Sequence, residues 1–278
     1  MTTLQQRALT GFSFAGVMIA AIFVHYYSFL ALFAIVTAMS LWEFFGLTLA
    51  EEPAKNTRKM VYTVFAMLPY CCAVAGALKV GDGRFNDIFL FLAACLFLFA
   101  TTILFIFELF LKGAKPFEQL GYLFLSIFYI TIPYCLLLKI GFDTRYHPAL
   151  IFGMLLLVWS NDSFAYLFGS RIGKNKLFPR ISPGKTWEGS AGGVLGAAIA
   201  ASLLYLVFPN ELPFQKWVVL AVIASIFGTL GDLVESMLKR SLDVKDSGTL
   251  LPGHGGILDR FDAFQFIIIP VFIYLIAF

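Results

Sequence analysis

Charged residues are scarce in this chain of 278 residues, because Lys, Arg, Asp and Glu together make up only 13% of it. A soluble domain carries roughly 25% charged residues. Hydrophobic residues account for 60%, and Phe alone occurs 32 times. The composition therefore excludes an ordinary soluble domain and predicts a polytopic membrane protein. Because the apolar stretches lack the alternation of barrel strands, we expect helical spans, which satisfy their backbone groups internally.

Cysteine is also rare, and the four cysteines show no metal-ligand spacing such as C-x-x-C. Cys71, Cys72, Cys95 and Cys135 all lie in apolar stretches, where we expect them to be small packing residues. The chain lacks an internal repeat and a low-complexity linker. Its first apolar run lacks a small-residue cleavage site, so we expect a retained helix and not a removed signal peptide. The sequence predicts one membrane domain over residues 1–278.

Nine apolar segments reach the length of about 20 residues that a transmembrane helix needs. They predict an all-α polytopic protein with about nine transmembrane helices, at roughly 8–24, 27–49, 60–79, 88–111, 118–140, 149–169, 187–208, 217–236 and 263–278. With these spans, 15 of the 20 Lys and Arg residues fall on the side that holds the N-terminus. The positive-inside rule then places the N-terminus in the cytoplasm and the C-terminus outside.

The two halves of the chain differ in their polar content. We predict that residues 1–150 form a hydrophobic helical scaffold and that residues 151–278 form a catalytic region. In the first part, Glu108 lies near a span end, where it could be functional or could simply cap or snorkel. The two loops richest in Lys and Arg, 170–186 and 237–262, lie in the second part and face the cytoplasm by this count. We therefore expect the chemistry in these loops.

The loop 170–186 is rich in donors suited to phosphate groups. These donors are Arg171, Lys174, Lys176, Arg180, Ser182 and Lys185. The segment Ser182–Thr186 leads directly into an apolar segment, and a helix beginning there would offer free N–H groups and its dipole to an anion. The G-x-x-x-x-G-K-[ST] spacing of a Walker A loop is missing. We predict a phosphate-binding site that includes Ser182, Lys185 and Thr186.

Carboxylates occur where apolar spans are interrupted or end. Asp162 follows Asn161 inside a span, and a buried acid is costly unless it is paired or binds a cation. Two further pairs of acids are three residues apart, so each pair shares a helix face. These pairs are Asp232 with Glu235, at the end of one span, and Asp259 with Asp262, at the start of the last. If the two spans pack antiparallel, the pairs converge.

Hard divalent cations prefer oxygen ligands, and Mg²⁺ typically takes one or two carboxylates plus substrate phosphates. The predicted metal ligands are Asp162, Asp232, Asp246, Asp259 and Asp262. Asp232 and Asp259 are expected to form the core of this site. The alternative is a network of salt bridges that ties two helices together.

The stretch Ser236–Asp262 carries the most specific pattern in the chain. Four of its bases could hold an anionic substrate, and His254 lies in the glycine-rich run Gly253–Gly256. The stretch matches, in order and spacing, the signature of phosphatidate cytidylyltransferases, also called CDP-diacylglycerol synthases. The matching positions are Ser236, Lys239, Arg240, Lys245, Asp246, Gly248, Pro252, His254, Gly255, Gly256, Asp259, Arg260 and Asp262. The chain thus resembles this family. Asn161-Asp162 and Ser182–Gly189 are similar to it too, whereas residues 1–150 agree only in being hydrophobic.

The resemblance implies that a cytidylyl group passes from CTP to phosphatidate, giving CDP-diacylglycerol and pyrophosphate in phospholipid biosynthesis. It implies a requirement for Mg²⁺ and the use of a second cation. The expected partners are CTP, phosphatidate and the lipid bilayer, with no nucleic acid, and a homodimer stays open. We expect the plasma (inner) membrane of a bacterium, with the active site facing the cytoplasm.

The resemblance also implies roles for individual residues. Together with the expected convergence of the acids, it predicts catalytic roles for Asp232, Lys239, Arg240, His254 and Asp259. It implies substrate or phosphate binding by Ser182, Lys185, Thr186, Ser236, Lys245, Gly255, Gly256 and Arg260.

Two other functions would use similar residues. A CTP-dependent lipid kinase would transfer the γ-phosphate to an alcohol, and it needs the same cation and phosphate ligands. Lipid labelled from the base of CTP would distinguish the two reactions. An ion-coupled transporter would use the carboxylates for its coupling ion, but transporters are commonly built from inverted repeats and broken helices with polar groups at the midplane. The sequence shows neither feature.

Overall fold

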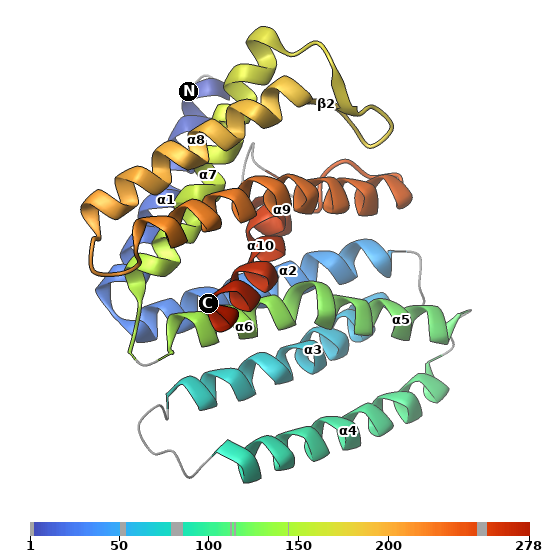
Figure 1. The fold of residues 1–278 in the computed structure, drawn as a ribbon. Coiled ribbons are helices and arrows are strands. Elements are labelled where there is room, and N and C mark those ends of the chain that lie inside the picture. Colours follow the sequence, from blue (N-terminus) through green and yellow to red (C-terminus); the bar gives the residue numbers. More distant parts are fainter. Residues whose placement is uncertain are drawn as a thin grey trace. The chain divides into compact units, whose positions relative to one another are not determined.

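A computed structural model gives the fold of this chain (Figure 1). It describes residues 3–50, 54–78, 86–111, 113, 115–143, 145–248 and 255–278, and it describes the side chains of these residues except for 3–10 and 86–93. The chain forms two compact units. The first combines Met1–Phe29 with Tyr146–Phe278, and the second is Leu30–Arg145. The expected single domain over 1–278 stays a prediction.

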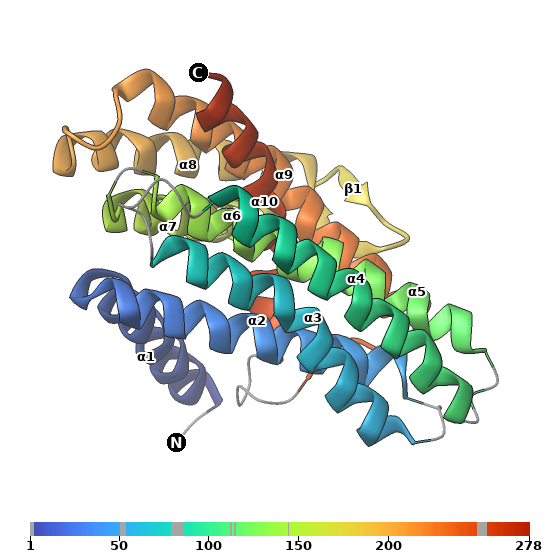
Figure 2. The same ribbon diagram turned by 90° about the horizontal axis from the view of Figure 1, so that it is seen from below.

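The first unit contains five long helices and a small hairpin among its described residues. The helices are α1 (Thr3–Val24), α7 (Pro148–Ile172), α8 (Trp187–Val207), α9 (Phe214–Ser241) and α10 (Leu258–Ala277). Helix α8 packs against α7 and α9, and α9 packs against α10. The second unit contains most of α2 (Tyr26–Thr48), together with α3 (Lys55–Ala77), α4 (Asn86–Phe110), α5 (Pro116–Ser126) and α6 (Ile132–Gly141). Within it, α3 and α4 lie side by side (Figure 2).

Each of the nine predicted segments coincides with a helix in the described part of the chain. Seven helices there are long and apolar enough to cross a membrane, and α5, a π-helical turn at Ile127–Thr131 and α6 together form one of them. The described apolar stretches of α1 and α4 are shorter, at Gly11–Val24 and Ala94–Phe110. The π-helical turn directly precedes Pro133, which has no backbone N–H to donate. The chain is an integral membrane protein of helical spans.

A two-stranded hairpin corrects the all-α prediction. Strand β1 (Lys176–Phe178) pairs antiparallel with β2 (Ser182–Thr186), with Lys176 opposite Thr186 and Phe178 opposite Ser182. The segment contains Pro179 and Pro183, and proline disfavours a helix interior because it lacks the N–H and clashes with the preceding turn. The loop between α7 and α8 therefore becomes an ordered hairpin.

The polar loop 237–262 is shorter than the sequence predicts, because helices continue into it from both ends. Lys239 and Arg240 lie in the last turn of α9, and Asp259 lies in the first turn of α10. Hydropathy locates where a chain leaves the bilayer, but Lys, Arg and Glu are good helix formers and do not end a helix. The charged residues are thus held by rigid helix ends.

A buried ion pair links α3 and α4 in the second unit. The Arg58 guanidinium is 0% exposed and its Nη2 lies 3.0 Å from Glu108 Oε2. The Nε of Arg58 also donates to both carboxylate oxygens, and Tyr62 Oη donates to Glu108 Oε1 at 2.7 Å. The Glu108 carboxylate therefore has a structural partner in the helix next to it.

Replacing Arg58 by Ala is expected to destabilise the protein by about 3–5 kcal/mol, because it leaves the buried Glu108 charge uncompensated. Lys115→Ala is the matched control, since Lys115 pairs with Glu118 at 2.9 Å on the surface and such pairs contribute about 1 kcal/mol or less. The melting temperature of each variant in detergent measures the difference. Equal, small shifts for both variants would contradict a stabilising role for the Arg58–Glu108 pair.

Candidate active site

A cavity of about 550 Å³ opens in the first unit between α7, the hairpin, α8, α9 and the start of α10. Five of the residues that line it are the acids proposed as metal ligands: Asp162, Asp232, Asp246, Asp259 and Asp262. Five more are predicted catalytic or phosphate-binding residues: Ser182, Lys185, Thr186, Lys239 and Arg260. The fold thus brings residues from four separate parts of the sequence to one place.

Close contacts between helices create this convergence. A Cβ added to Gly193 of α8 would lie 2.5 Å from Asn161 Oδ1 of α7. A Cβ added to Gly231 of α9 would lie 2.7 Å from the backbone oxygen of Asp262 in α10. Small residues let helices approach closely within a membrane. Glycine at these two positions therefore lets α7 and α10 carry their carboxylates to the cavity.

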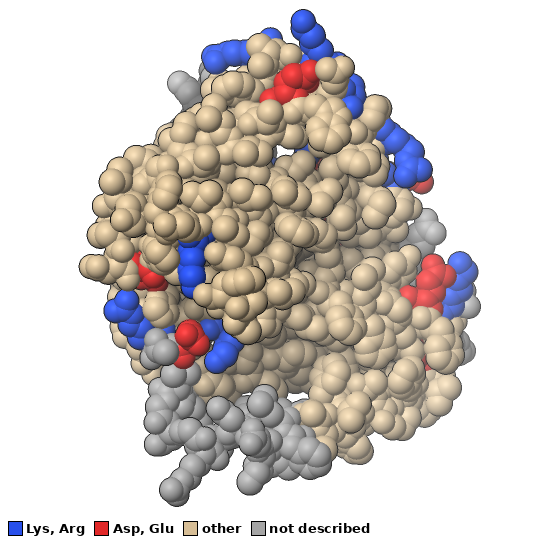
Figure 3. All heavy atoms as spheres, in the orientation of Figure 1, with Lys and Arg blue, Asp and Glu red and all other residues tan. Residues whose placement is uncertain are grey.

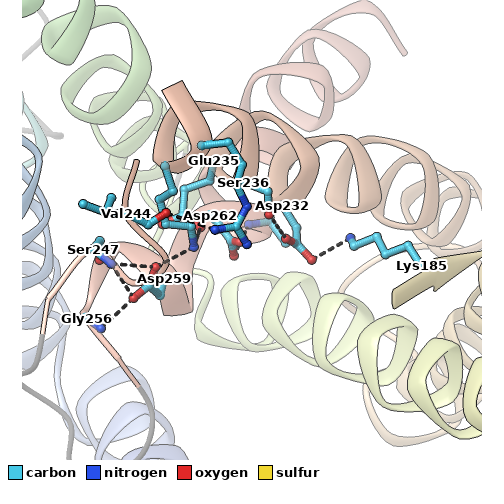
Figure 4. A network of polar contacts seen from close by, with 12 residues as sticks. Lys185, Asp232, Glu235, Ser236, Val244, Ser247, Gly256, Asp259 and Asp262 are labelled. Atoms are coloured by element: carbon cyan, nitrogen blue, oxygen red, sulfur yellow. Dashed lines mark hydrogen bonds and ion pairs between the residues drawn. The ribbon is translucent and has the colours of Figure 1, made fainter. Parts of the chain in front are cut away.

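The hairpin supplies one wall of the cavity. Thr186 caps α8, because its Oγ1 accepts a hydrogen bond from the Gly189 N–H at 3.1 Å. The neighbouring Lys185 reaches across to α9, where its Nζ lies 2.5 Å from Asp232 Oδ2 (Figure 4). Ser236 Oγ donates to the other oxygen of Asp232 at 3.2 Å. A predicted phosphate ligand and a predicted metal ligand, far apart in the sequence, are therefore direct neighbours.

A second network holds α9, α10 and the loop between them together. The Lys239 Nζ donates to Glu235 Oε2 and to Asp259 Oδ1, both at 2.7 Å. The Asp259 carboxylate also accepts backbone N–H groups from Ser247 at 3.0 Å and from Gly256 at 2.8 Å. Asp259 therefore binds both described stretches of this loop, 242–248 and 255–257.

Gly255 is required beside this carboxylate. Its φ is +80°, which is in the left-handed region, and an added Cβ would lie 2.5 Å from Asp259 Oδ2. Only glycine adopts this backbone conformation without strain and leaves room for the carboxylate.

Several predicted site residues lie outside the cavity wall. Among the described residues these are Ser236, Arg240, Lys245, Gly255 and Gly256. Ser236 and the Gly256 N–H donate hydrogen bonds to Asp232 and Asp259, respectively. Arg240 is exposed and donates to the Val244 carbonyl at 3.1 Å. His254 lies outside the described residues. The roles predicted for all of these residues stay predictions.

The structure adds residues that were not predicted for the site. Glu235 is 0% exposed, binds Lys239, and its Oε1 is buried with no hydrogen-bond partner among the described residues. Tyr166 and Ser170 line the cavity on the same face of α7 as Asp162. Asp162, Tyr166 and Ser170 are spaced four residues apart. The sequence could have predicted their common position from this spacing, because residues four apart share a helix face. Thr229, three residues before Asp232, lines the cavity for the same reason.

The carboxylates suit a hard cation, although they do not form a closed cage. The charge of Asp162 interacts with those of Asp232, Lys185 and Arg260. The charge of Asp262 interacts with those of Asp232 and Asp162. No three His, Cys, Asp or Glu side chains among the described residues form a group that could hold a metal ion. Mg²⁺ commonly binds through one or two carboxylates plus substrate phosphates and retains several waters. The donor set therefore fits an ion that is completed by a phosphate-bearing ligand.

Comparisons with known proteins identify the family of this chain. A sequence profile described as "Cytidylyltransferase family" matches residues 5–278. A protein of Bacillus subtilis named phosphatidate cytidylyltransferase is 43% identical over 180 residues, which cover 65% of this chain and 66% of that protein. The proteins of the same name from Staphylococcus saprophyticus and from Staphylococcus aureus strain COL are 40% and 42% identical, over 56% of this chain and 59% of each relative.

The alignments thus span just under two thirds of the first of these relatives and less of the other two. The profile match, in contrast, runs from residue 5 to the last residue of the chain and includes every residue that lines the cavity. This chain therefore belongs to the cytidylyltransferase family.

Proposed function

We propose that this protein transfers the cytidylyl group of CTP to phosphatidate, giving CDP-diacylglycerol and pyrophosphate. The proposal rests on the cavity, which is lined by Lys185, Arg260 and five carboxylates. The chain that forms this cavity belongs to the cytidylyltransferase family. The names of the relatives support this reaction over a CTP-dependent lipid kinase or an ion-coupled transporter. The cavity is lined by the C-terminal parts of α7 and α9 and the N-terminal parts of α8 and α10. In this proposal these parts lie at the membrane surface, where a lipid headgroup and a soluble nucleotide can meet.

The reaction needs no nucleophile from the protein. A phosphate oxygen of phosphatidate attacks the α-phosphorus of CTP, a new phosphorus–oxygen bond forms, and the bond to pyrophosphate breaks. Phosphoryl transfer of this kind depends chiefly on positioning and on neutralising charge. In this proposal Lys185, Ser182 and the N-terminus of α8 hold phosphate oxygens on the hairpin side. Arg260 and Lys239 supply positive charge from α10 and α9.

We propose Mg²⁺ as the cofactor, with a second cation beside it. Asp232 and Asp259 would form the core of the binding site, with Asp162, Asp246 and Asp262 nearby. A carboxylate offers about four acceptor positions. Asp259 uses most of its positions for Lys239, Ser247 and Gly256, so it has few left for a cation. The bound cation would neutralise the charge on the reacting phosphates.

Labelling from CTP tests the reaction. Membranes containing the protein, given phosphatidate, Mg²⁺ and CTP labelled in the base, are expected to yield labelled lipid, and excess EDTA should abolish the product. The control uses CTP labelled in the γ-phosphate, from which no label should reach the lipid. Label from the γ-phosphate but not from the base would identify a lipid kinase and overturn the proposal.

We also propose nine spans, with the N-terminus in the cytoplasm of a bacterial cell, the C-terminus outside and the cavity facing the cytoplasm. The distribution of Lys and Arg supports this orientation. A reporter fused after Phe278 is therefore expected to be active only when it is designed to work outside the cytoplasm. A cysteine placed in the 170–186 loop should react with a membrane-impermeant label only from the cytoplasmic side. A cytoplasmic reporter at the C-terminus would rule out nine spans in this orientation.

A further inference from the structure

Four basic side chains, at the end of α7 and in the connection to α8, do not line the cavity. Six side chains of this segment are donors suited to phosphate, but among them only Ser182 and Lys185, which were predicted to bind it, line the cavity wall. The other four are exposed, and they are Arg171, Lys174, Lys176 and Arg180. Within the described part of the chain, none of the four forms an ion pair. Their positive charge is therefore available to a partner outside the protein.

The surrounding residues leave this charge uncompensated. The only acid between residues 163 and 210 is Glu188. Its carboxylate accepts hydrogen bonds from the backbone N–H of Lys174 at 3.1 Å and from Asn175 Nδ2 at 2.7 Å. Glu188 thus fixes the start of the hairpin and does not pair with the four bases. Figure 3 shows Lys and Arg side chains gathered along the upper edge of the molecule, over the end of α7 and the hairpin.

Large apolar side chains are exposed among these bases. Ile172 is 54% exposed, Phe178 is 46% exposed and Trp187 is 63% exposed. A surface that combines bases with aromatic and aliphatic side chains is typical of segments that lie at a membrane–water interface. A nucleotide would use the charges and could stack its base on one aromatic ring, but it would leave the other apolar side chains without a partner. The composition therefore favours a lipid surface over a soluble anion.

The chain connectivity holds the hairpin close to a bilayer. Helix α7 ends at Ile172 and α8 begins at Trp187, and both helices are long and apolar enough to span a membrane. The hairpin is the whole connection between them, and it extends beyond the helix ends (Figure 1). Its bases thus stay near the headgroups, where charges act over a Debye length of about 8 Å at physiological salt.

We propose that the hairpin surface formed by Arg171, Ile172, Lys174, Lys176, Phe178, Arg180 and Trp187 docks on the anionic headgroup layer of the membrane that holds the protein. Strand β2 of the same hairpin carries Ser182 and Lys185 of the cavity wall, and Ser182 is the cross-strand partner of Phe178. Docking therefore keeps that wall at the depth of the lipid headgroups. The inference needs only the membrane-spanning helices and holds whichever reaction the cavity performs.

A fluorescent probe on the hairpin tests the docking. Pro179, which lies at the tip and is exposed, is changed to Cys in a full-length chain whose four native cysteines are replaced by Ala, and the new thiol carries an environment-sensitive dye. The protein is reconstituted in nanodiscs of phosphatidylcholine alone or of phosphatidylcholine with phosphatidylglycerol. We expect blue-shifted emission in the anionic nanodiscs only, and its reversal at high salt. Equal emission in both lipids would overturn the proposal.

Variants that remove one positive charge provide a second test of the docking. Lys176→Gln and Arg180→Gln should each shift the equilibrium between docked and undocked hairpin about fivefold towards the undocked state. Each base near an anionic surface contributes about 1 kcal/mol to binding, which corresponds to this factor. Lys115→Gln, an exposed lysine of the other unit, should leave the emission unchanged. If the hairpin variants behave like Lys115→Gln, the bases do not hold the hairpin on the membrane. A shift produced by CTP in phosphatidylcholine nanodiscs, and not by anionic lipid, would identify a nucleotide surface instead.

Discussion

Replacing Asp232 by Asn is expected to lower turnover by at least about a hundredfold, because the loss of one preorganised charge-stabilising group costs about that much or more. Asp232 lies on α9 at the centre of the cavity, where its carboxylate contacts Lys185 and Ser236. Asn has the same shape but no charge, so the helix and the hydrogen bond from Ser236 should persist. Activity is measured on purified protein over a series of Mg²⁺ concentrations, together with the melting temperature.

Asp243→Asn is the matched control for this variant. Asp243 is an exposed acid just after α9 with a φ of 53°, a conformation that Asn accepts readily. The same chemical change at this position should leave both turnover and melting temperature unaltered. If the carboxylates only tie helices together, Asp232→Asn should instead lower the melting temperature and keep its activity per folded molecule. That outcome would remove Asp232 from the proposed cation site.

Replacing Lys239 by Met is expected to destabilise the protein by about 3–5 kcal/mol, because it strands buried carboxylates without their cation. The Lys239 Nζ is the shared donor to Glu235, which is 0% exposed, and to Asp259. Turnover should fall as well, because Lys239 lines the cavity and holds Asp259, which accepts hydrogen bonds from Ser247 and Gly256. Thermal unfolding in detergent and initial rates per folded molecule separate the two effects.

A double variant distinguishes a structural lysine from a catalytic one. Adding Glu235→Gln to Lys239→Met replaces the stranded acid with a neutral amide, while Asp259 keeps its two backbone donors. We expect the melting temperature to recover most of its loss and the turnover to stay low, since the positive charge at the cavity is still missing. Recovery of both properties would mean that Lys239 serves only to hold the helices together.

Several features of this protein follow from local sequence alone. Apolar runs of sufficient length predict helices because a bilayer offers no hydrogen bonds to the backbone, and the helices indeed occupy those runs. The acids and bases of the polar stretches predict a phosphate and cation site. Both properties depend on residues that are close together in the chain.

Only the tertiary structure determines which of these charged side chains are in contact. Lys185 and Lys239 enter the cavity and bind Asp232 and Asp259, whereas Arg240 turns to a nearby carbonyl. Nothing in the local sequence separates these bases, because their directions depend on the hairpin that carries Lys185 and on how far α9 continues beyond its apolar part. The helix contacts at Gly193 and Gly231 are set by packing between segments that are far apart in the sequence. A charge pattern therefore determines that a site exists, and packing between distant helices determines which residues form it.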